Sequence, residues 1–201
     1  MAMLETHRVV ITGMGVISPL GSALESFWES LAAGRHGIGP VTTFDTSAFR
    51  CSLVAEARGY DPADWFDRRE ARRMDRFCQF AMAAAQQAMT MSGLDMADCD
   101  PFRIGTIVGS GVGGLHTTHA EFDKFFHHGI NRVSPLFIPM MISNMAAGTI
   151  SMKFGTKGDC TCVTTACASG AHSIGEAYRA IRYGHLDACI AGGCEAPITP
   201  I

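Results

Sequence analysis

The stretch Cys160-Thr161-Cys162-Val163-Thr164-Thr165-Ala166-Cys167-Ala168-Ser169-Gly170 predicts a short strand that turns directly into a helix. Residues 160–164 form a β-rich run, and a helical run follows from about Ala168 to Tyr183, closed by Gly184. A strand that turns sharply into a helix presents the turn residue at the end of a sheet, as the nucleophile elbow of hydrolases does. The stretch therefore predicts an α/β fold with Cys167 at the end of a strand.

Cys167 has the surroundings of a nucleophile. At the N-terminus of a helix, unpaired N–H groups and the helix dipole favour the thiolate, which is the reactive form of cysteine. The small neighbours Ala166, Ala168 and Ser169 leave room for a substrate to approach. The alternative is a cysteine packed as a small hydrophobe, which is the usual role of a single cysteine. The local pattern alone leaves both interpretations open.

The rest of the chain continues the alternation of strands and helices. Further strands are predicted at 7–17, 103–108 and 187–191. Helices are predicted at 22–33, 75–91, 117–126 and 140–154, the first of them opened by the capping box Ser22-Ala23-Leu24-Glu25. Residues 34–60 are predicted to be an irregular excursion, and 134–139 a loop between two prolines. This order is typical of a layered α/β protein with a mostly parallel sheet.

The composition limits the class of protein. A chain of 201 residues with 47% apolar and 17% charged residues is long enough for one domain with a sizeable core. The formal net charge of -3 argues against bulk binding of nucleic acid. No apolar run has the length of a membrane span, and Met1–His7 lacks the apolar segment of a signal peptide. Eight cysteines without a secretory signal indicate reduced thiols and a cytoplasmic protein.

Two other kinds of site match the sequence poorly. Gly109-Ser110-Gly111-Val112-Gly113-Gly114 has the G-x-G-x-x-G spacing of dinucleotide sites, but no second strand ending in an acidic residue follows about twenty positions on. We therefore expect no cofactor, and interpret the glycines as a loop that lets backbone approach a ligand or another chain. Cys160 with Cys162, and His116 with His119, lack further ligands at metal-site spacing, so no metal is expected.

Five segments in order resemble one family. They are Arg8–Gly21, Gly109–Leu115, Ser134–Pro139, Thr164–Ala177 and Ala191–Glu195. Together they resemble the β-ketoacyl-acyl-carrier-protein synthases, the elongating type most closely, and they extend from one end of the chain to the other. The resemblance implies a thiolase-like fold without a cofactor. It also implies decarboxylative condensation of an acyl thioester with malonyl-acyl-carrier protein in fatty acid elongation, through an acyl-Cys167 intermediate.

The resemblance also implies roles for four further residues. Val112 stands where an apolar side chain of the family limits the length of the acyl chain, and Phe137 lines the same region. Without the resemblance, both would be interpreted as core residues. Arg69 and Arg72 match the family's basic positions that receive the acidic acyl carrier protein, and the planar fork of arginine suits carboxylates and phosphates. Without the resemblance, this basic run would be interpreted as solvated surface.

The resemblance covers only part of the family's chain. The family places two catalytic histidines and a lysine in its C-terminal half, beyond the matching positions. Within this sequence no histidine is placed to act as the base, because His172 on a helix points away from the thiol of Cys167. We therefore expect residues 1–201 to be the N-terminal half of the fold, incomplete at Ile201 and inactive alone. The family also implies a homodimer through 160–164 and 140–154, and an exposed sheet edge favours association.

Two alternatives stay open. A polyketide-type condensing enzyme has the same cysteine segment, and its acyl-chain preference would separate it from the fatty-acid type. A non-catalytic partner that binds the carrier or dimerises would resemble paralogues that have lost the nucleophile. The presence of Cys167 argues against the second alternative, and thiol reactivity would decide it.

Overall fold

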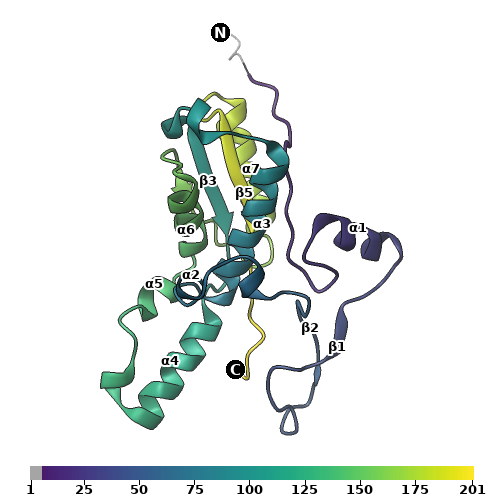
Figure 1. Cartoon of the computed structure of the whole chain (residues 1–201), viewed down its shortest axis with the longest axis vertical. Coiled ribbons are helices and arrows are strands. Elements are labelled where there is room, and N and C mark those ends of the chain that lie inside the picture. The colour runs from purple at the N-terminus through teal and green to yellow at the C-terminus, as the bar shows by residue number, and fades with distance from the viewer. Residues whose placement is uncertain (1–5) are drawn as a thin grey trace.

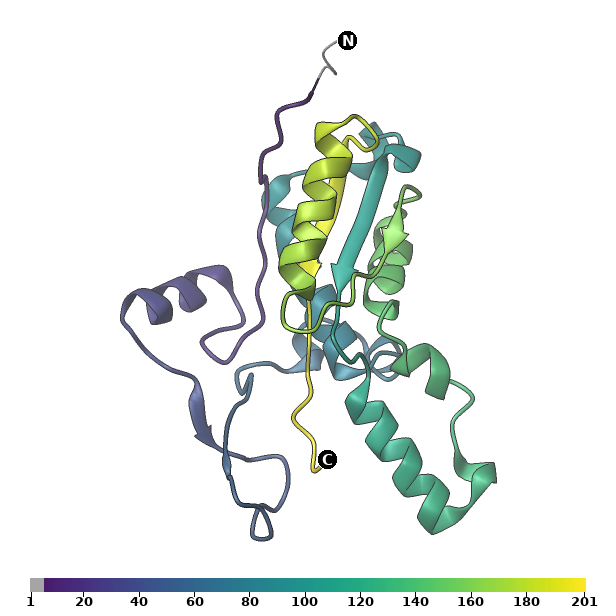
Figure 2. The same cartoon turned by 180° about the vertical axis from the view of Figure 1, so that it is seen from behind.

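The computed structural model describes residues 6–201 (Figure 1). The prediction about a signal peptide depends on residues 1–7, of which 1–5 lie outside the described range. Within that range, no helix combines the length and the apolar character needed to cross a membrane. The chain forms a central α/β body from which two extensions project, an N-terminal excursion and a helical arm (Figures 1 and 2).

A three-stranded parallel sheet forms the centre of the body. β3 (Ile104–Gly109) lies between β4 (Cys160–Thr161) and β5 (Ala188–Gly193). β3 and β5 pair along their whole length, whereas β4 contributes only two residues. The strand order and direction confirm the predicted α/β fold with a parallel sheet. The predicted strand at 160–164 is shorter than expected. The chain stops pairing with β3 after Thr161 and enters the turn that precedes the next helix.

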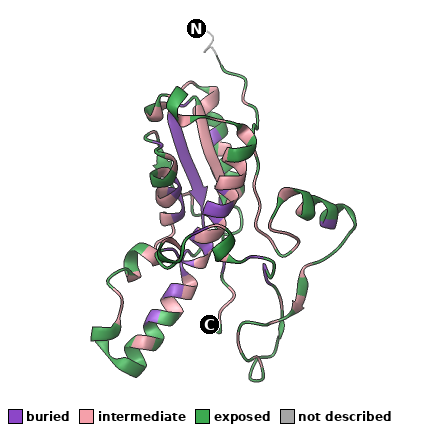
Figure 3. Cartoon of the chain, viewed as in Figure 1, coloured by how far each residue is buried: buried purple, intermediate pink, exposed green. Residues whose placement is uncertain are grey.

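Helices cover both faces of this sheet. α7 (Ser169–Arg182) packs on one face, and α6 (Met145–Phe154) with α3 (Arg76–Ser92) covers the other (Figures 1 and 2). β3 is buried along its whole length, whereas the two extensions are largely exposed (Figure 3). Small residues let α6 approach the sheet closely. The most buried residues of these helices are Phe77, Met82, Ala83, Ala146, Ala147, Ile150 and Ser173.

Local signals set the ends of the main helices. The Asp75 carboxylate caps α3 by accepting from Phe77 N at 3.2 Å, and Gly93 ends the helix with a left-handed φ of 65°. Gly184 follows α7 with a φ of 76°. The predicted helices at 75–91 and 168–183 are therefore confirmed to within a residue or two. The short turns η1 (Pro62–Asp64), α2 (Arg68–Ala71), η2 (Met96–Asp98) and η3 (Pro101–Arg103) are also each capped by an aspartate.

The N-terminal excursion holds a helix and a small sheet. α1 (Leu24–Ala32) confirms the predicted first helix, but the predicted capping box is wrong. Ala23 occupies the N-cap without a side-chain bond, and the buried Ser22 Oγ has no partner within the described chain. β1 (Ile38–Pro40) and β2 (Leu53–Ala55) pair antiparallel, so the excursion is more regular than predicted.

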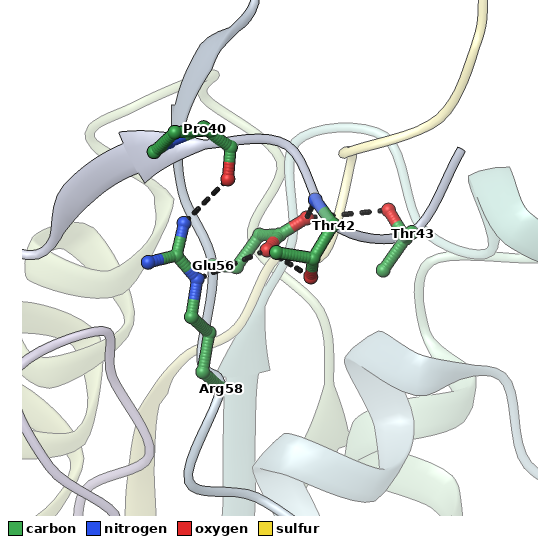
Figure 4. Close-up of polar contacts among 5 residues, drawn as sticks. All are labelled: Pro40, Thr42, Thr43, Glu56 and Arg58. Atoms are coloured by element: carbon green, nitrogen blue, oxygen red, sulfur yellow. Dashed lines mark hydrogen bonds and ion pairs between the residues drawn. The ribbon is translucent and has the colours of Figure 1, made fainter. Parts of the chain in front are cut away.

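A buried carboxylate links the two strands of this small sheet by hydrogen bonds. Glu56, directly after β2, accepts hydrogen bonds from the residues that follow β1 and from Arg58 (Figure 4). Its partners are Thr42 N at 3.0 Å, Thr42 Oγ1 at 2.7 Å, Thr43 Oγ1 at 3.2 Å and Arg58 Nε at 3.2 Å. Arg58 also donates to Pro40 O at 2.6 Å. One charged side chain therefore holds both strands of the excursion.

The arm consists of α4 (Leu115–His128), the turn η4 (Ile130–Arg132) and α5 (Phe137–Met141). α4 confirms the predicted helix at 117–126 and is longer at both ends. The predicted loop at 134–139 is wrong in its second half, because α5 begins at Phe137. Pro139 fits there, since an N–H in the first turn of a helix has no intrahelical acceptor.

The predicted helix at 140–154 is two helices. α5 ends at Met141 and α6 begins at Met145, with Ile142 extended between them. The Met141 carbonyl accepts from Gly114 N at 2.8 Å, so it is bonded to the loop after β3 and not to a further helical turn. A long-range contact therefore breaks a segment whose composition favours one helix.

Residues 7–17 do not form the predicted strand. The segment runs alongside α3, so closely that a Cβ on Gly13 or Gly15 would lie 2.0 Å or 1.9 Å from a helix carbonyl oxygen. Val16 bonds through its N and O to the side chain of Gln87, at 3.4 Å and 3.1 Å. In the described part of the chain, neither sheet includes this segment. Its apolar, glycine-containing pattern reflects close packing on a helix.

Candidate active site

Cys167 lies in the turn between β4 and α7, two residues before the helix begins, and it is exposed. Ala166 before it has a φ of 52°, the one positive value for a non-glycine residue within 6–201. This backbone costs a residue with a Cβ about 1 kcal/mol or more. Ser169 Oγ holds the turn by accepting from Thr165 N at 2.9 Å and donating to Ala166 O at 2.7 Å. The structure thus forms the predicted elbow at the N-terminus of a helix; the nucleophilic role of Cys167 stays a prediction.

Glycines bring this elbow against the ends of two parallel strands. A Cβ on Gly109, the last residue of β3, would lie 2.7 Å from Ser169 O. A Cβ on Gly193, the last residue of β5, would lie 2.6 Å from the Cα of Gly170. Such close contact between backbones requires glycine. The N-terminus of α7 therefore lies at the carboxyl ends of β3 and β5, where open α/β sheets bind their ligands.

The loop after β3 reaches the elbow from another direction. Gly111 N and Val112 N both donate to Glu195 Oε2, at 2.7 Å and 3.1 Å, and Ser110 Oγ donates to Oε1 at 3.2 Å. A Cβ on Gly111 would lie 2.9 Å from Glu195 Oε2 and 3.6 Å from the Cα of Ala166. The loop therefore lies between the Glu195 carboxylate and the elbow. No role is predicted for Glu195 from the sequence; its signals are its place in the resembling segment Ala191–Glu195 and its position two residues after a glycine-rich strand.

The two residues expected to line an acyl pocket lie on different parts of the chain. Val112 is 59% exposed and belongs to the loop beside the elbow. Phe137 begins α5 on the arm, where its ring packs edge-on against Phe122 of α4 with 6.3 Å between centroids. The loop and α5 are joined through the bond from Gly114 N to Met141 O. The structure thus places Val112 directly after Gly111, the residue that approaches the elbow, and places Phe137 in the packing of the arm.

The basic run forms an exposed cluster around α2. Asp67 caps this short helix by accepting from Arg69 N and Glu70 N on one oxygen, at 2.7 Å and 2.8 Å. Arg69 and Arg72 lie together, and Leu136 of the arm completes the hollow that they share with Arg68 and Arg73. None of the four arginines pairs with a carboxylate within residues 6–201. Their positive charges are therefore open to an acidic partner.

Burial separates Cys167 from the packing cysteines. Burial raises the pKa of Cys78 to about 11 and that of Cys189 to about 12, which disfavours their thiolates. Three cysteines are exposed, namely Cys51, Cys160 and Cys167. Of these, Cys167 alone stands at the N-terminus of a helix. The eight cysteines all lie in the described range and are unpaired.

Two histidines lie close to the residues discussed above, His172 in α7 and His116 beside the loop after β3. His172 Nδ1 lies 2.7 Å from Thr165 Oγ1. His116, at the start of α4, is half-buried, and burial lowers its pKa. Over residues 6–201, no three His, Cys, Asp or Glu side chains come together in a way that could hold a metal ion.

A concave surface lies next to the Glu195 carboxylate. An open recess of about 390 Å³ is lined by residues of the excursion, α3, the start of α4 and the segment after β5. Its charged and titratable lining residues are Glu195, His116, Glu56, Arg58 and Arg76. Through Glu195, this recess adjoins the loop that carries Val112.

Comparison with known proteins agrees with this geometry. The family model for the N-terminal domain of β-ketoacyl synthases matches residues 6–201. The 3-oxoacyl-[acyl-carrier-protein] synthase 2 of Synechocystis sp. is 44% identical over 201 residues, and that of Coxiella burnetii is 43% identical over 198. These alignments cover 100% and 98% of this chain and 48% of each relative. The chain therefore spans about half the length of the curated relatives it matches.

A solved structure shares the same fold. The ishigamide ketosynthase/chain length factor superposes with a TM-score of 0.86 and 31% sequence identity, over 95% of this chain and 48% of that chain. The layered α/β body with its parallel sheet thus corresponds to the N-terminal half of a thiolase-like fold. By the family match over 6–201, the chain belongs to the β-ketoacyl synthase family and represents its N-terminal domain.

Proposed function

We propose that the chain supplies the cysteine-bearing half of a condensing enzyme of fatty acid elongation. The observation that carries the proposal is the elbow, where the exposed Cys167 follows a strained Ala166 and precedes the N-terminus of α7. Backbone strain of this kind is held in place by its surroundings and gathers at functional sites. The names of the curated relatives support the reaction class.

The chemistry proceeds in two steps through Cys167. Its thiolate attacks the carbonyl of an acyl-carrier thioester, the carrier thiol leaves, and the acyl group becomes a thioester of Cys167. Malonyl-carrier then loses carbon dioxide, and the resulting carbanion attacks the acyl carbonyl. A carbon–carbon bond forms, the Cys167 thiolate leaves, and the product is a 3-oxoacyl-carrier. The Cys167 N–H serves as one donor to the oxyanion formed in each attack.

The groups that assist decarboxylation lie outside this chain. Within residues 6–201, the histidine nearest in sequence to Cys167 is His172, whose Nδ1 is bonded to Thr165. We therefore propose that residues 1–201 form one domain that contributes the nucleophile, while other parts of the enzyme supply the base. The 201 residues alone should not turn over, although Cys167 can accept an acyl group.

Acyl carrier protein is the proposed partner. Arg69 and Arg72 offer unpaired positive charge beside an apolar side chain, Leu136, and an acidic carrier complements that surface. A second copy of the chain is the other proposed partner, through β4 and α6. β4 lies at the edge of the sheet with both of its residues exposed, which suits pairing across an interface. Unpaired cysteines support a reducing compartment, and we propose the cytoplasm.

Mapping of an acyl adduct tests the nucleophile. The whole protein that carries this chain is incubated with acyl-carrier thioester, and its intact mass and peptides are measured. The expected result is one acyl group on Cys167, removed by Cys167→Ala and retained in Cys160→Ala, which alters another exposed cysteine. An adduct that survives Cys167→Ala would overturn the assignment.

A polyketide-type condensing enzyme is the second candidate. The similarity to the ishigamide ketosynthase/chain length factor favours it, although the identity of 31% is below the 44% to a 3-oxoacyl-[acyl-carrier-protein] synthase 2. Competition between saturated acyl-carriers and polyketide-type acyl-carriers for Cys167 separates the two. Preference for the saturated chains supports fatty acid elongation.

A further inference from the structure

The loop that carries Val112 is held by its backbone. Gly111 N and Val112 N share one oxygen of Glu195, and the Val112 side chain is 59% exposed, so packing does not fix its position. Two successive N–H groups on one acceptor define the orientation of the peptide between them. The other acceptors of the loop are Ser110 Oγ for Gly113 N at 3.0 Å and Met141 O for Gly114 N at 2.8 Å.

Glu195 is itself fixed to the strand from which the loop departs. Cys194 N donates to Gly109 O at 3.0 Å, directly beyond the pairing of Gly109 with Gly193. The backbone next to Glu195 is therefore bonded to the sheet through Cys194, while the Glu195 carboxylate accepts from Gly111 N and Val112 N. This connection places Val112 relative to the elbow, because Gly111 is also the residue that approaches Ala166.

We propose that Glu195 is a positioning residue for acyl-chain selectivity. It holds the backbone of Val112 next to Gly111 and the elbow, so that the Val112 side chain limits the space for the acyl chain at a fixed length. Glu195 does not touch the substrate and acts through Val112. The proposal rests on the proposed function, and it adds a determinant of which acyl chain the site accepts.

The test measures selectivity and not only rate. Rates of Cys167 acylation by octanoyl- and palmitoyl-carrier thioesters are measured for the whole protein, before and after Glu195→Gln. Glutamine keeps the size of the side chain but weakens its acceptance of two N–H groups and the Ser110 hydroxyl. We expect the ratio of the two rates to move toward one by about fivefold. A role in folding alone would change both rates equally and leave their ratio unchanged.

Asp67→Asn is the matched control. Asp67 also accepts two successive backbone N–H groups on one oxygen, but at α2, away from the loop after β3. Its replacement removes the same kind of contact, and we expect an unchanged ratio. Hydrogen exchange at the amides of Gly111 and Val112 supplies a second readout, with protection lost in Glu195→Gln and kept in Asp67→Asn.

A double-mutant cycle identifies the route of the effect. If Glu195 acts through Val112, then Glu195→Gln changes the ratio in the unmodified protein and has no further effect after Val112→Ala. An effect of equal size in both backgrounds overturns the proposal. So does a ratio unchanged by Glu195→Gln, or an unmodified protein that accepts both chains equally.

Failure of this inference can be told from failure of the proposed function. If the unmodified protein acquires no acyl group on Cys167 from either thioester, the proposed function fails and the inference fails with it. If Cys167 is acylated but the ratio is insensitive to Glu195→Gln, the function stands and the positioning role of Glu195 is wrong.

Discussion

Replacing Glu56 by glutamine should remove a stabilisation that depends on pH. Burial alone would raise the pKa of the Glu56 carboxyl, but hydrogen bonds from Thr42, Arg58 and Thr43 outweigh burial and lower the pKa from 4.5 to about 2. One pKa unit corresponds to ~1.4 kcal/mol, so the ionised carboxylate stabilises the folded chain by about 3 kcal/mol. The carboxyl is almost fully buried, with 7% of the side chain exposed, so solvent screens these bonds little.

The direction of the pH dependence follows because the pKa of Glu56 is lower in the folded chain than in the unfolded chain. The stabilisation is complete above the unfolded value near 4.5 and is lost as the pH falls toward 2. At about pH 3 the unfolded chain has bound most of a proton at Glu56, whereas the folded chain still holds the carboxylate. About 2 of the about 3 kcal/mol is then gone. Acidification should therefore reduce the difference in unfolding free energy by which the unmodified protein is more stable than Glu56→Gln.

Urea unfolding followed by tryptophan fluorescence measures this stability difference, since Trp65 packs against the core. The difference in unfolding free energy between the unmodified protein and Glu56→Gln is compared at neutral pH and at about pH 3. We expect it to shrink by about 2 kcal/mol. The exposed Glu29 serves as control, because Glu29→Gln should change stability by less than about 0.5 kcal/mol at both pH values. A Glu56 difference that is the same at both pH values would refute the reasoning.

Four further outcomes are expected. Charge reversal at Arg69 and Arg72 should weaken carrier binding about tenfold or more at low salt and less at high salt, as measured by titration; affinity unchanged at every salt concentration would contradict the docking surface. Val112→Phe should slow acylation by palmitoyl-carrier about tenfold more than by octanoyl-carrier. Gly15→Ala should destabilise by more than about 2 kcal/mol, because its Cβ would lie 1.9 Å from a carbonyl oxygen of α3. Gly175→Ala, with nothing within 4 Å of the added Cβ, should raise the melting temperature and stabilise by up to about 1 kcal/mol.

Elements with their own end signals were predictable from the sequence. α3 has the cap Asp75 and the stop Gly93, and α7 has the stop Gly184, so their bounds followed from local chemistry. β3 and β5 are apolar runs bounded by turn signals, and their parallel pairing followed from the alternation with helices. The elbow at Cys167 followed from the same logic, since it joins a predicted strand to a predicted helix.

Elements that depend on distant partners were not predictable. Residues 7–17 have the composition of a strand, yet Gly13 and Gly15 fit against a helix that the local pattern does not reveal. The break between α5 and α6 depends on a carbonyl bonded to the loop after β3. The bonds of Glu195 join residues more than eighty positions apart, so no periodicity or spacing indicates them.

The glycines at the elbow explain why separate motifs belong together. Gly109, Gly170 and Gly193 come from three of the resembling segments and meet where α7 begins; Gly170 and Gly193 make room for each other, and Gly109 makes room for Val163 and Ser169. A Cβ on Gly193 would need about 1 Å more space than the 2.6 Å it has to the Cα of Gly170. That shift would move the first turn of α7, and Cys167 with it. If Cys167 is the proposed nucleophile, a displacement of about 1 Å at its sulfur would cost on the order of a hundredfold in rate, so these glycines would matter for the reaction as well as for the fold.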